Sequence, residues 1–273
     1  LDGVHTGSSP CLITVGVQRI GSYPQGGGGG GGLFDGYIDQ LSISFNKAKT
    51  AAQILADATL VAYYTMDCLS YISWDSGPNQ IQGTTYGLST GDGGRVGQSY
   101  LFNSDLSYFQ ASGLVLLGQA YRPYSFAMWL RPLVITGGTI MQVSSQTNGL
   151  GWCLPFLGLS SSGQIITMSW TGSSAPTVVG PVLTVRQWVH IATSYSQTNG
   201  LRLYVNGALY GQTSAFVYSP GLTPMTVTLG NHLNGTTCAN NGIQRAQYYG
   251  QIDEFQIFSR ELVATEVSLM ANP

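Results

Sequence analysis

The sequence predicts an all-β protein, an antiparallel two-sheet β-sandwich, on the strength of three observations. Apolar and polar residues alternate in short runs, Gly, Pro, Asn and Ser interrupt these runs, and helical periodicity is nearly absent. Alternation with a period of two is typical of half-buried strands, because successive side chains point to opposite faces. Many short strands separated by turn residues indicate a sandwich.

Six runs show the alternation most clearly and are expected to form strands. They are Leu60–Met66, Tyr124–Leu130, Gln164–Trp170, Trp188–Tyr195, Leu201–Val205 and Gln251–Phe258. Asn206 and Gly207 follow one of these strands directly. Both residue types tolerate a positive φ, so we expect a tight hairpin turn there.

Composition excludes several classes of function. Only 8% of the 273 residues are charged and the net charge is −2. A surface so poor in Lys and Arg offers no field for nucleic acid or anionic lipid. Apolar tracts are short, and none approaches the 18 residues that a membrane-spanning helix needs.

The four cysteines, Cys11, Cys68, Cys153 and Cys238, lack the spacing of a metal site. Cys153 lies in a strand-like run, and Cys238 lies in a long loop without periodicity that a cross-link would hold in place. We therefore expect a Cys153–Cys238 disulfide, with Cys11 and Cys68 paired to each other or to segments outside this chain. Together with low charge and an Asn234-Gly-Thr glycosylation sequon, this predicts a secreted or cell-surface protein.

An internal repeat divides the chain. FDGYIDQLSIS (34–44) aligns without gaps on YYGQIDEFQIF (248–258), and the match continues from 47–54 onto 260–267. Residues 1–58 therefore read as the C-terminal part of one domain and 59–273 as a complete second copy. Thr50 and Gln53 form a capping-box pattern that predicts a short helix, whereas Val263 in the second copy predicts a weaker helix start.

Seven motifs carry a resemblance to a known family. In order they are LVAYYTMD, DSGPN, GRVGQSYLFN, YSFAMWLRP, QWVHIATSY, LRLYVNGALYGQ and GQIDEFQIFSREL. The sequence 59–273 resembles laminin-G-like (concanavalin A-like) jelly rolls in full, and 1–58 resembles their C-terminal end. The resemblance implies two curved antiparallel sheets, with the first strand near the last. It also implies an extracellular adhesive, carbohydrate-binding or architectural module, but it does not fix a ligand.

No catalytic residue is expected. The laminarinase-type glucanases share the jelly roll and carry carboxylates at alternate positions of one strand, but here Gln251 and Phe255 flank Asp253. Strict alternation places Asp253 on the core face with Phe255, and Glu254 on the opposite face. A retaining glycosidase needs two carboxyls about 5 Å apart on one face. In the first repeat Asp39 is flanked by Tyr37 and Leu41, so that strand also offers only one carboxylate on its face.

A carboxylate on a core face must be paired or bound to metal, so Asp253 has two interpretations. Its carboxylate accepts hydrogen bonds from nearby backbone amides, or it binds Ca²⁺ with help from Asp75 and Asn79. The first interpretation requires no cofactor, and Ca²⁺ is the only cofactor that the sequence suggests.

Several aromatic residues in loop-like stretches are candidates for stacking on sugars. They are Tyr108, Tyr121, Tyr124, Tyr218 and Trp74. Ordinary packing in the core or at its rim is the alternative for each of them.

Two functions remain. The first is an extracellular structural or adhesive module of a tandem-repeat or filament-forming protein, whose partners are copies of itself or neighbouring repeats. The predicted strands at 12–17 and 36–45 lack neighbours within 1–58, so another chain or an upstream segment would complete them by strand addition. The alternative is a lectin-like module that binds glycans, with or without Ca²⁺.

Overall fold

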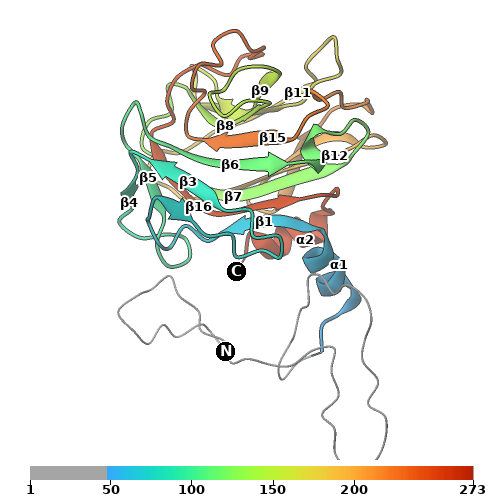
Figure 1. The fold of residues 1–273 in the computed structure, drawn as a ribbon, viewed down its shortest axis with the longest axis horizontal. Helices are drawn as coiled ribbons and strands as arrows, with labels where there is room; N and C mark the ends of the chain where they lie inside the picture. The colour runs from blue at the N-terminus through green and yellow to red at the C-terminus, as the bar shows by residue number, and fades with distance from the viewer. Residues whose placement is uncertain (1–47, 273) are drawn as a thin grey trace, which may run out of the picture. The chain divides into compact units, whose positions relative to one another are not determined.

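Two antiparallel eight-stranded sheets pack face to face as a sandwich (Figure 1). This computed structural model describes residues 48–272, almost all of them in the unit Thr50–Pro273. The jelly-roll sandwich expected from the sequence is therefore confirmed for this unit. The parts of the prediction that fall within 1–47, including Cys11, Asp39, the two strands at 12–17 and 36–45, and most of the first repeat, lie outside the described residues.

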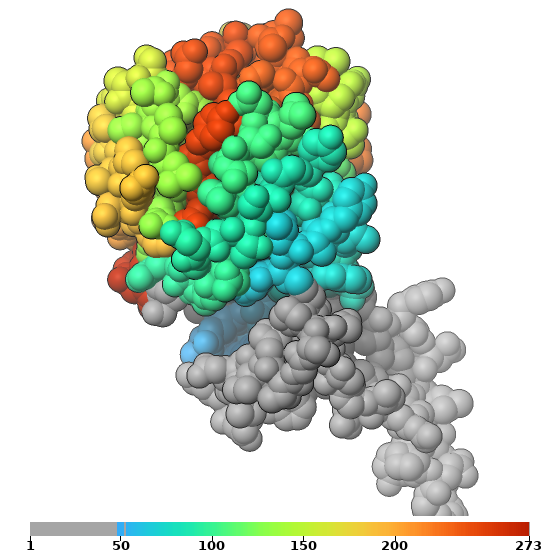
Figure 2. All heavy atoms as spheres, turned by 90° about the vertical axis from the view of Figure 1, so that its left-hand side faces the viewer, coloured from blue at the N-terminus to red at the C-terminus, as the bar shows by residue number. Residues whose placement is uncertain are grey.

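The first sheet has the order β14-β13-β12-β7-β16-β5-β4, and β1 pairs with β16 beside it. Its strands are β1 (Leu60–Tyr64), β4 (Ser89–Thr90), β5 (Tyr100–Phe102), β7 (Tyr124–Pro132), β12 (Val189–Ser196), β13 (Gly200–Val205), β14 (Ala208–Gln212) and β16 (Gly250–Phe258). The expected proximity of the first and last strands is confirmed by the β1–β16 pair. On the side shown in Figure 2, red C-terminal residues lie in a strip between teal and green segments, in keeping with β16 between β5 and β7.

The second sheet has the order β11-β10-β9-β8-β15-β6-β3-β2. Its strands are β2 (Ile72–Ser73), β3 (Gly83–Tyr86), β6 (Tyr108–Leu114), β8 (Gly138–Ser144), β9 (Cys153–Leu159), β10 (Gln164–Met168), β11 (Thr177–Val182) and β15 (Met225–Leu229). Aromatic rings fill the space between the sheets; Phe109, for example, packs edge-on against Tyr64 with ring centroids 4.7 Å apart. Such pairs stabilise a core beyond their buried area.

Turns and helix ends follow the local signals of the sequence. Asn206 and Gly207 have φ values of 49° and 81° and join β13 to β14, as a hairpin of this type requires. Helix α1 (Ala51–Thr59) begins at Thr50 with the predicted capping box. Helix α2 (Ala264–Met270) and a short 3₁₀ turn η1 (Leu116–Gly118) are the remaining elements. Val263 offers α2 no side-chain cap, although its N–H donates to Glu266.

The prediction that Asp253 shares a face with Phe255 and Ile257 is wrong. The pairing of β16 with β7 shifts register between Asp253 and Gln256, and Glu254 there has a φ of +54°. This β-bulge breaks the alternation, because an extra residue is inserted on one strand. Ile252 therefore packs in the core, while Asp253 lies opposite Trp129 on the outer face of the first sheet.

Glu254 lies on that same outer face, so its predicted separation from Asp253 is also wrong. With Trp129 and His190 it lines a small cavity of about 120 Å³. Its carboxylate accepts a hydrogen bond from the Tyr63 hydroxyl. Burial raises the pKa of Glu254, and Asp67 acts in the same direction.

Candidate functional site

Two tyrosines form a flat aromatic platform on the outer face of the second sheet. Tyr86 on β3 and Tyr108 on β6 are paired across the two strands, and their rings stack with centroids 5.4 Å apart. The neighbouring Phe109 and Ala111 point into the core, so alternation directs Tyr108 outward. Tyr86 is 52% exposed, which leaves its ring available to a ligand.

Loops from distant parts of the chain enclose this platform and make a groove of about 690 Å³. We call it the tyrosine groove. Its lining residues are Tyr86, Asp105, Leu106, Tyr108, Gln110, Thr147, Asn148, Asn231, His232, Leu233, Asn234 and Gln247. Amides, hydroxyls and one exposed carboxylate dominate this list, so the groove offers both donors and acceptors above an aromatic floor.

Hydrogen bonds between side chains and backbone brace the walls. The amide of Gln110 donates to the Thr147 carbonyl at 2.8 Å and to the Thr228 hydroxyl at 2.9 Å. Asn231 donates to the Asp105 carbonyl at 3.0 Å and accepts from the Leu233 N–H at 2.8 Å. The groove is therefore largely preformed, which lowers the entropy cost of binding.

Two buried polar atoms of groove-lining side chains have no hydrogen-bond partner in the part of the chain that the structure describes. They are Gln247 Oε1 and His232 Nδ1. The amide nitrogen of Gln247 is held by the Ser107 carbonyl at 2.9 Å, and the side chain is almost entirely buried. Burial lowers the pKa of His232, which favours its neutral form. Both atoms are shielded from solvent, so in this conformation neither contacts a ligand in the groove directly.

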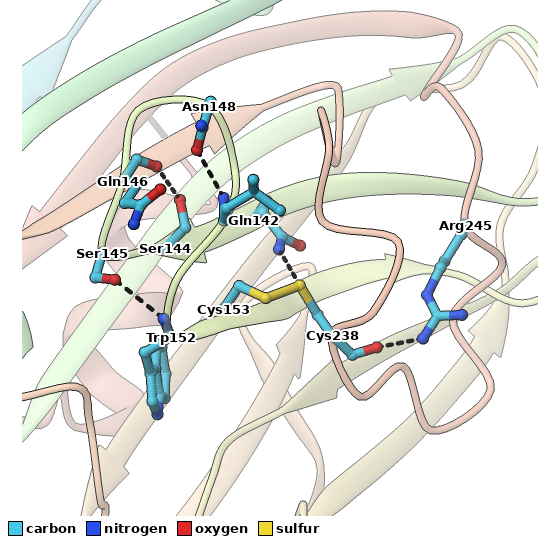
Figure 3. The surroundings of a disulfide bond; sticks show 10 residues. Gln142, Ser144, Ser145, Gln146, Asn148, Trp152, Cys153, Cys238 and Arg245 are labelled. Atoms are coloured by element: carbon cyan, nitrogen blue, oxygen red, sulfur yellow. Dashed lines mark hydrogen bonds between the residues drawn. A yellow bond between two sulfur atoms is a disulfide. The ribbon is translucent and has the colours of Figure 1, made fainter.

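A disulfide holds the loop that follows β15 and contributes residues 231–234 to the tyrosine groove (Figure 3). Cys153, at the start of β9, is bonded to Cys238, four residues after Asn234, as the sequence predicted. The Gln142 amide donates to the Cys238 sulfur at 3.2 Å, and the Arg245 guanidinium donates to the Cys238 carbonyl. The Asn234 N–H also donates to the Asn148 carbonyl at 3.1 Å, which joins the two loops. Cys68 is disulfide-bonded as well, and its predicted partner Cys11 lies outside the described residues.

Asn234, the predicted glycosylation site, is exposed at the rim of the tyrosine groove. Thr236 of the same sequon is exposed too, so a modifying enzyme has access to both. Glycan attachment to Asn234 stays a prediction.

The structure uses the three predicted calcium ligands in other ways. The Asp75 carboxylate accepts from the N–H groups of Tyr63, Gly77 and Ile81. The Asn79 amide donates to the Leu60 and Val61 carbonyls. Among residues 48–272 no three His, Cys, Asp or Glu side chains are grouped as metal ligands.

Asp253 is completely buried on the outer face, beneath the loop of residues 93–97. Its Oδ2 accepts from the N–H groups of Arg95, at 2.7 Å, and Val96, at 3.0 Å. These contacts match the interpretation in which the carboxylate holds backbone amides. Burial, opposed by these hydrogen bonds, raises the Asp253 pKa to about 7.

Of the aromatic candidates from the sequence, Tyr108 alone lines the tyrosine groove. Tyr124 and Tyr218 are core residues, and the exposed Tyr121 and Trp74 lie outside the groove lining. Tyr86 was missed, although it is the more exposed half of the platform. Only its cross-strand pairing with Tyr108 reveals it, and the sequence does not display that register.

No helix among the described residues is long and apolar enough to cross a membrane.

Solved structures with the same fold include several binding domains. Domain 4 of AbnA, an extracellular arabinanase of family GH43 from Geobacillus stearothermophilus solved with arabinotriose, aligns with a TM-score of 0.53 and 20% identity over 78% of this chain and 98% of its own. The binding domain of Paraclostridial Mosquitocidal Protein 1 aligns with a TM-score of 0.58 and 18% identity, over 79% of this chain and 52% of its own.

A structure of botulinum neurotoxin type C, whose cell entry is dependent upon interaction with two ganglioside molecules, aligns with a TM-score of 0.56 and 13% identity over 79% of this chain and 51% of its own. The chain thus spans about half the length of the two toxin structures. At these identities the likeness shows the fold alone.

Sequence comparison identifies the family. A search of curated proteins finds no match. A laminin G family model, described as the concanavalin A-like lectin/glucanases superfamily, matches residues 103–268, which is more than half of the chain. This span runs from the end of β5 into α2 and includes most strands of both sheets. The chain therefore belongs to the concanavalin A-like lectin/glucanases superfamily.

Proposed function

We propose that this protein is a non-catalytic, extracellular carbohydrate-binding module and that the tyrosine groove is its sugar site. The observation that carries the proposal is the stacked Tyr86–Tyr108 platform beneath a rim of amide side chains. A flat ring packs against the apolar C–H face of a sugar, while amides and a carboxylate exchange hydrogen bonds with its hydroxyls.

The character of the lining favours a neutral sugar. Asp105 is the only charged residue of the groove lining, and its carboxylate already accepts from the Tyr249 hydroxyl. The amide and hydroxyl side chains of the lining offer both donors and acceptors, which suits the hydroxyl groups of a saccharide. The neutral arabinotriose in the AbnA domain structure supports this ligand class, whereas the gangliosides of the neurotoxin support a glycan only in general.

We expect no hydrolysis. Asp253 and Glu254 do share a face, but Asp253 is fully buried beneath the 93–97 loop and Glu254 is bonded to Tyr63. The cavity beside them, about 120 Å³, is too small for a sugar chain. Glycosidases instead place two carboxyls on either side of an accessible glycosidic bond.

We also expect binding without Ca²⁺, because the side chains of Asp75, Asn79 and Asp253 already hold backbone groups. The disulfide supports a secreted or cell-surface location, since such bonds persist in oxidising compartments. Assembly into filaments through residues 1–58 stays a prediction, whose test is described in the Discussion.

The test is a screen of neutral oligosaccharides followed by calorimetry on the best binder. Tyr86→Ala and Tyr108→Ala should each weaken binding about tenfold, as expected for the loss of a stacking contact of about 1.4 kcal/mol. Tyr71→Ala is the matched control, because Tyr71 is 73% exposed and lies outside the groove. Binding that survives both groove substitutions, or that EDTA abolishes, would contradict the proposal.

A further inference from the structure

A second concave site lies on the opposite side of the sandwich, on the outer face of the first sheet. It has a volume of about 670 Å³ and combines three arginines with two tryptophans, Arg95, Arg131, Arg186, Trp129 and Trp188. We call it the arginine pocket. The entire chain has only ten Lys and Arg residues, so three in one pocket is a strong local concentration of positive charge.

We propose that Arg95 and Arg186 form a binding site for an acidic sugar, holding its carboxylate while Trp188 and Asn206 receive the sugar ring. This site shares no residue with the tyrosine groove and does not depend on it. It would give the module two faces that bind saccharides of different charge.

The charge balance inside the pocket leaves two cations available. Arg131 is neutralised by Asp92 at 2.6 Å, and it also donates to the Gln251 side chain at 2.9 Å. Arg95 and Arg186 are exposed, and within residues 48–272 neither forms an ion pair with a carboxylate. The pocket therefore holds three positive charges against one negative charge at its lining.

Arg95 is held in position by two neighbours. Its guanidinium carbon lies 4.7 Å from the centre of the Trp129 ring, a cation–π distance. Its backbone N–H donates to buried Asp253 at 2.7 Å, and the adjacent Val96 N–H does the same. An arginine stacked in this way loses little further freedom on binding, and its N–H groups at the edge remain free to donate.

Arg186 is fixed through its backbone. Its φ is +61°, a left-handed conformation that is costly for a residue with a side chain. Its N–H donates to the Pro132 carbonyl at 2.7 Å, and its own carbonyl accepts from Arg131 at 3.2 Å. Both contacts tie the turn to the end of β7. The structure thus maintains a strained turn that places a second cation at the rim of the pocket.

The chemistry of the lining favours a carboxylated sugar over other anions. A guanidinium fork binds a carboxylate through paired, charge-assisted hydrogen bonds. Trp188 is half-buried and offers a ring to a saccharide, and Asn206, whose Oδ1 accepts from the His190 N–H at 3.0 Å, keeps its NH₂ group as a donor. Two free arginines are too few for nucleic acid, which needs many phosphate contacts.

Trigalacturonate is a suitable probe, with its fully methyl-esterified form as the neutral comparison. Binding can be followed by tryptophan fluorescence, because Trp129 and Trp188 line the pocket. We expect the acid to bind and the ester to bind at least tenfold more weakly. Arg95→Ala and Arg186→Ala should each reduce the affinity for the acid about tenfold, the usual effect of losing a charge-assisted contact. Arg186→Lys should recover only part of the loss.

Arg122→Ala provides the matched control. Arg122 is an exposed arginine outside the pocket whose guanidinium donates to Gln119, and its loss changes the net charge equally. Melting curves of all variants establish that they fold. Equal losses in Arg122→Ala and Arg95→Ala, equal binding of acid and ester, or full displacement by equimolar inorganic sulfate would overturn the assignment. Tyr86→Ala should leave this binding unchanged, so failure of the groove proposal and failure of this one are separable.

Discussion

Two residues on the outer face of the first sheet, His190 and Asp253, have pKa values shifted in opposite directions, and Trp129 lies between them. His190, Trp129 and Asp253 lie side by side on β12, β7 and β16. Burial lowers the His190 pKa to about 4 and raises the Asp253 pKa to about 7. Each shift changes the free energy of unfolding with pH, because the folded and unfolded states then bind different numbers of protons.

The two contributions have opposite signs. His190 is protonated in the unfolded chain below about pH 6.5 but stays neutral in the folded protein until about pH 4, so its contribution to stability falls as the pH drops through this window. Asp253 takes up its proton near pH 7 only in the folded protein, so its contribution rises as the pH drops toward 4. Each group changes the free energy of unfolding by at most about 1.4 kcal/mol per pH unit. Because the two changes have opposite signs, they largely cancel in the wild type.

We therefore predict that replacing either residue alone makes the free energy of unfolding depend on pH. Relative to the wild type, Asp253→Asn should lose stability on acidification from pH 6.5 to 4.5, and His190→Gln should gain it. Urea unfolding at several pH values measures both differences. Parallel pH profiles of the two variants and the wild type would show that these groups are not perturbed as the structure indicates.

At the scale of elements, the Cys153–Cys238 disulfide connects the second sheet to the loop that forms one wall of the tyrosine groove. It closes a segment with a sequence separation of 85 residues, for which the chain-entropy model gives about 4–5 kcal/mol of stabilisation as an upper figure. The segment between Gly230 and β16 contains little regular structure, and besides the disulfide it is held by hydrogen bonds to β8 and β9 and by the buried side chain of Ile243.

We predict that Cys153→Ser/Cys238→Ser loses binding in the tyrosine groove before it loses the fold. Without the cross-link the segment around Asn234 has one restraint fewer beside the groove, so the affinity for the neutral sugar should fall, while the hydrogen bonds of Asn231 to Asp105 keep the rest of the wall in place. Binding of trigalacturonate by the arginine pocket should persist, because that pocket lies on the other sheet. Calorimetry with both ligands on the same sample measures this contrast. Equal loss of both activities would indicate global unfolding instead.

The strands and their turns could be predicted from the sequence because their signals are local. The six expected strands, the Asn206-Gly207 hairpin and the Thr50 capping box all occur. The error at Asp253 arose from a bulge, which no period-two rule detects when the inserted residue is Glu254 instead of Gly. The groove and the pocket were not predictable, since each assembles residues from segments more than 100 positions apart.

For the whole molecule, the repeat in the sequence has a consequence for assembly. Residues 34–44 match 248–258, which correspond to β16, and β16 is a central strand that pairs with β1, β5 and β7. In the unit Thr50–Pro273 that strand already has all these neighbours. A second copy of a central strand needs neighbours of its own, because a strand that cannot pair leaves its backbone groups without partners.

We predict that another chain or an upstream segment supplies these neighbours; if another chain does so, the molar mass from light scattering should rise with concentration. A variant that begins at Thr50, with Cys68→Ser to remove a free thiol, retains all strands of the sandwich and should stay at a constant mass. The contact joins different surfaces, so it need not close and can propagate as a filament. Constant mass of the full chain, or equal growth of the shortened variant, would refute assembly through 1–49. Because the tyrosine groove and the arginine pocket lie within the shortened variant, both ligands should still bind it.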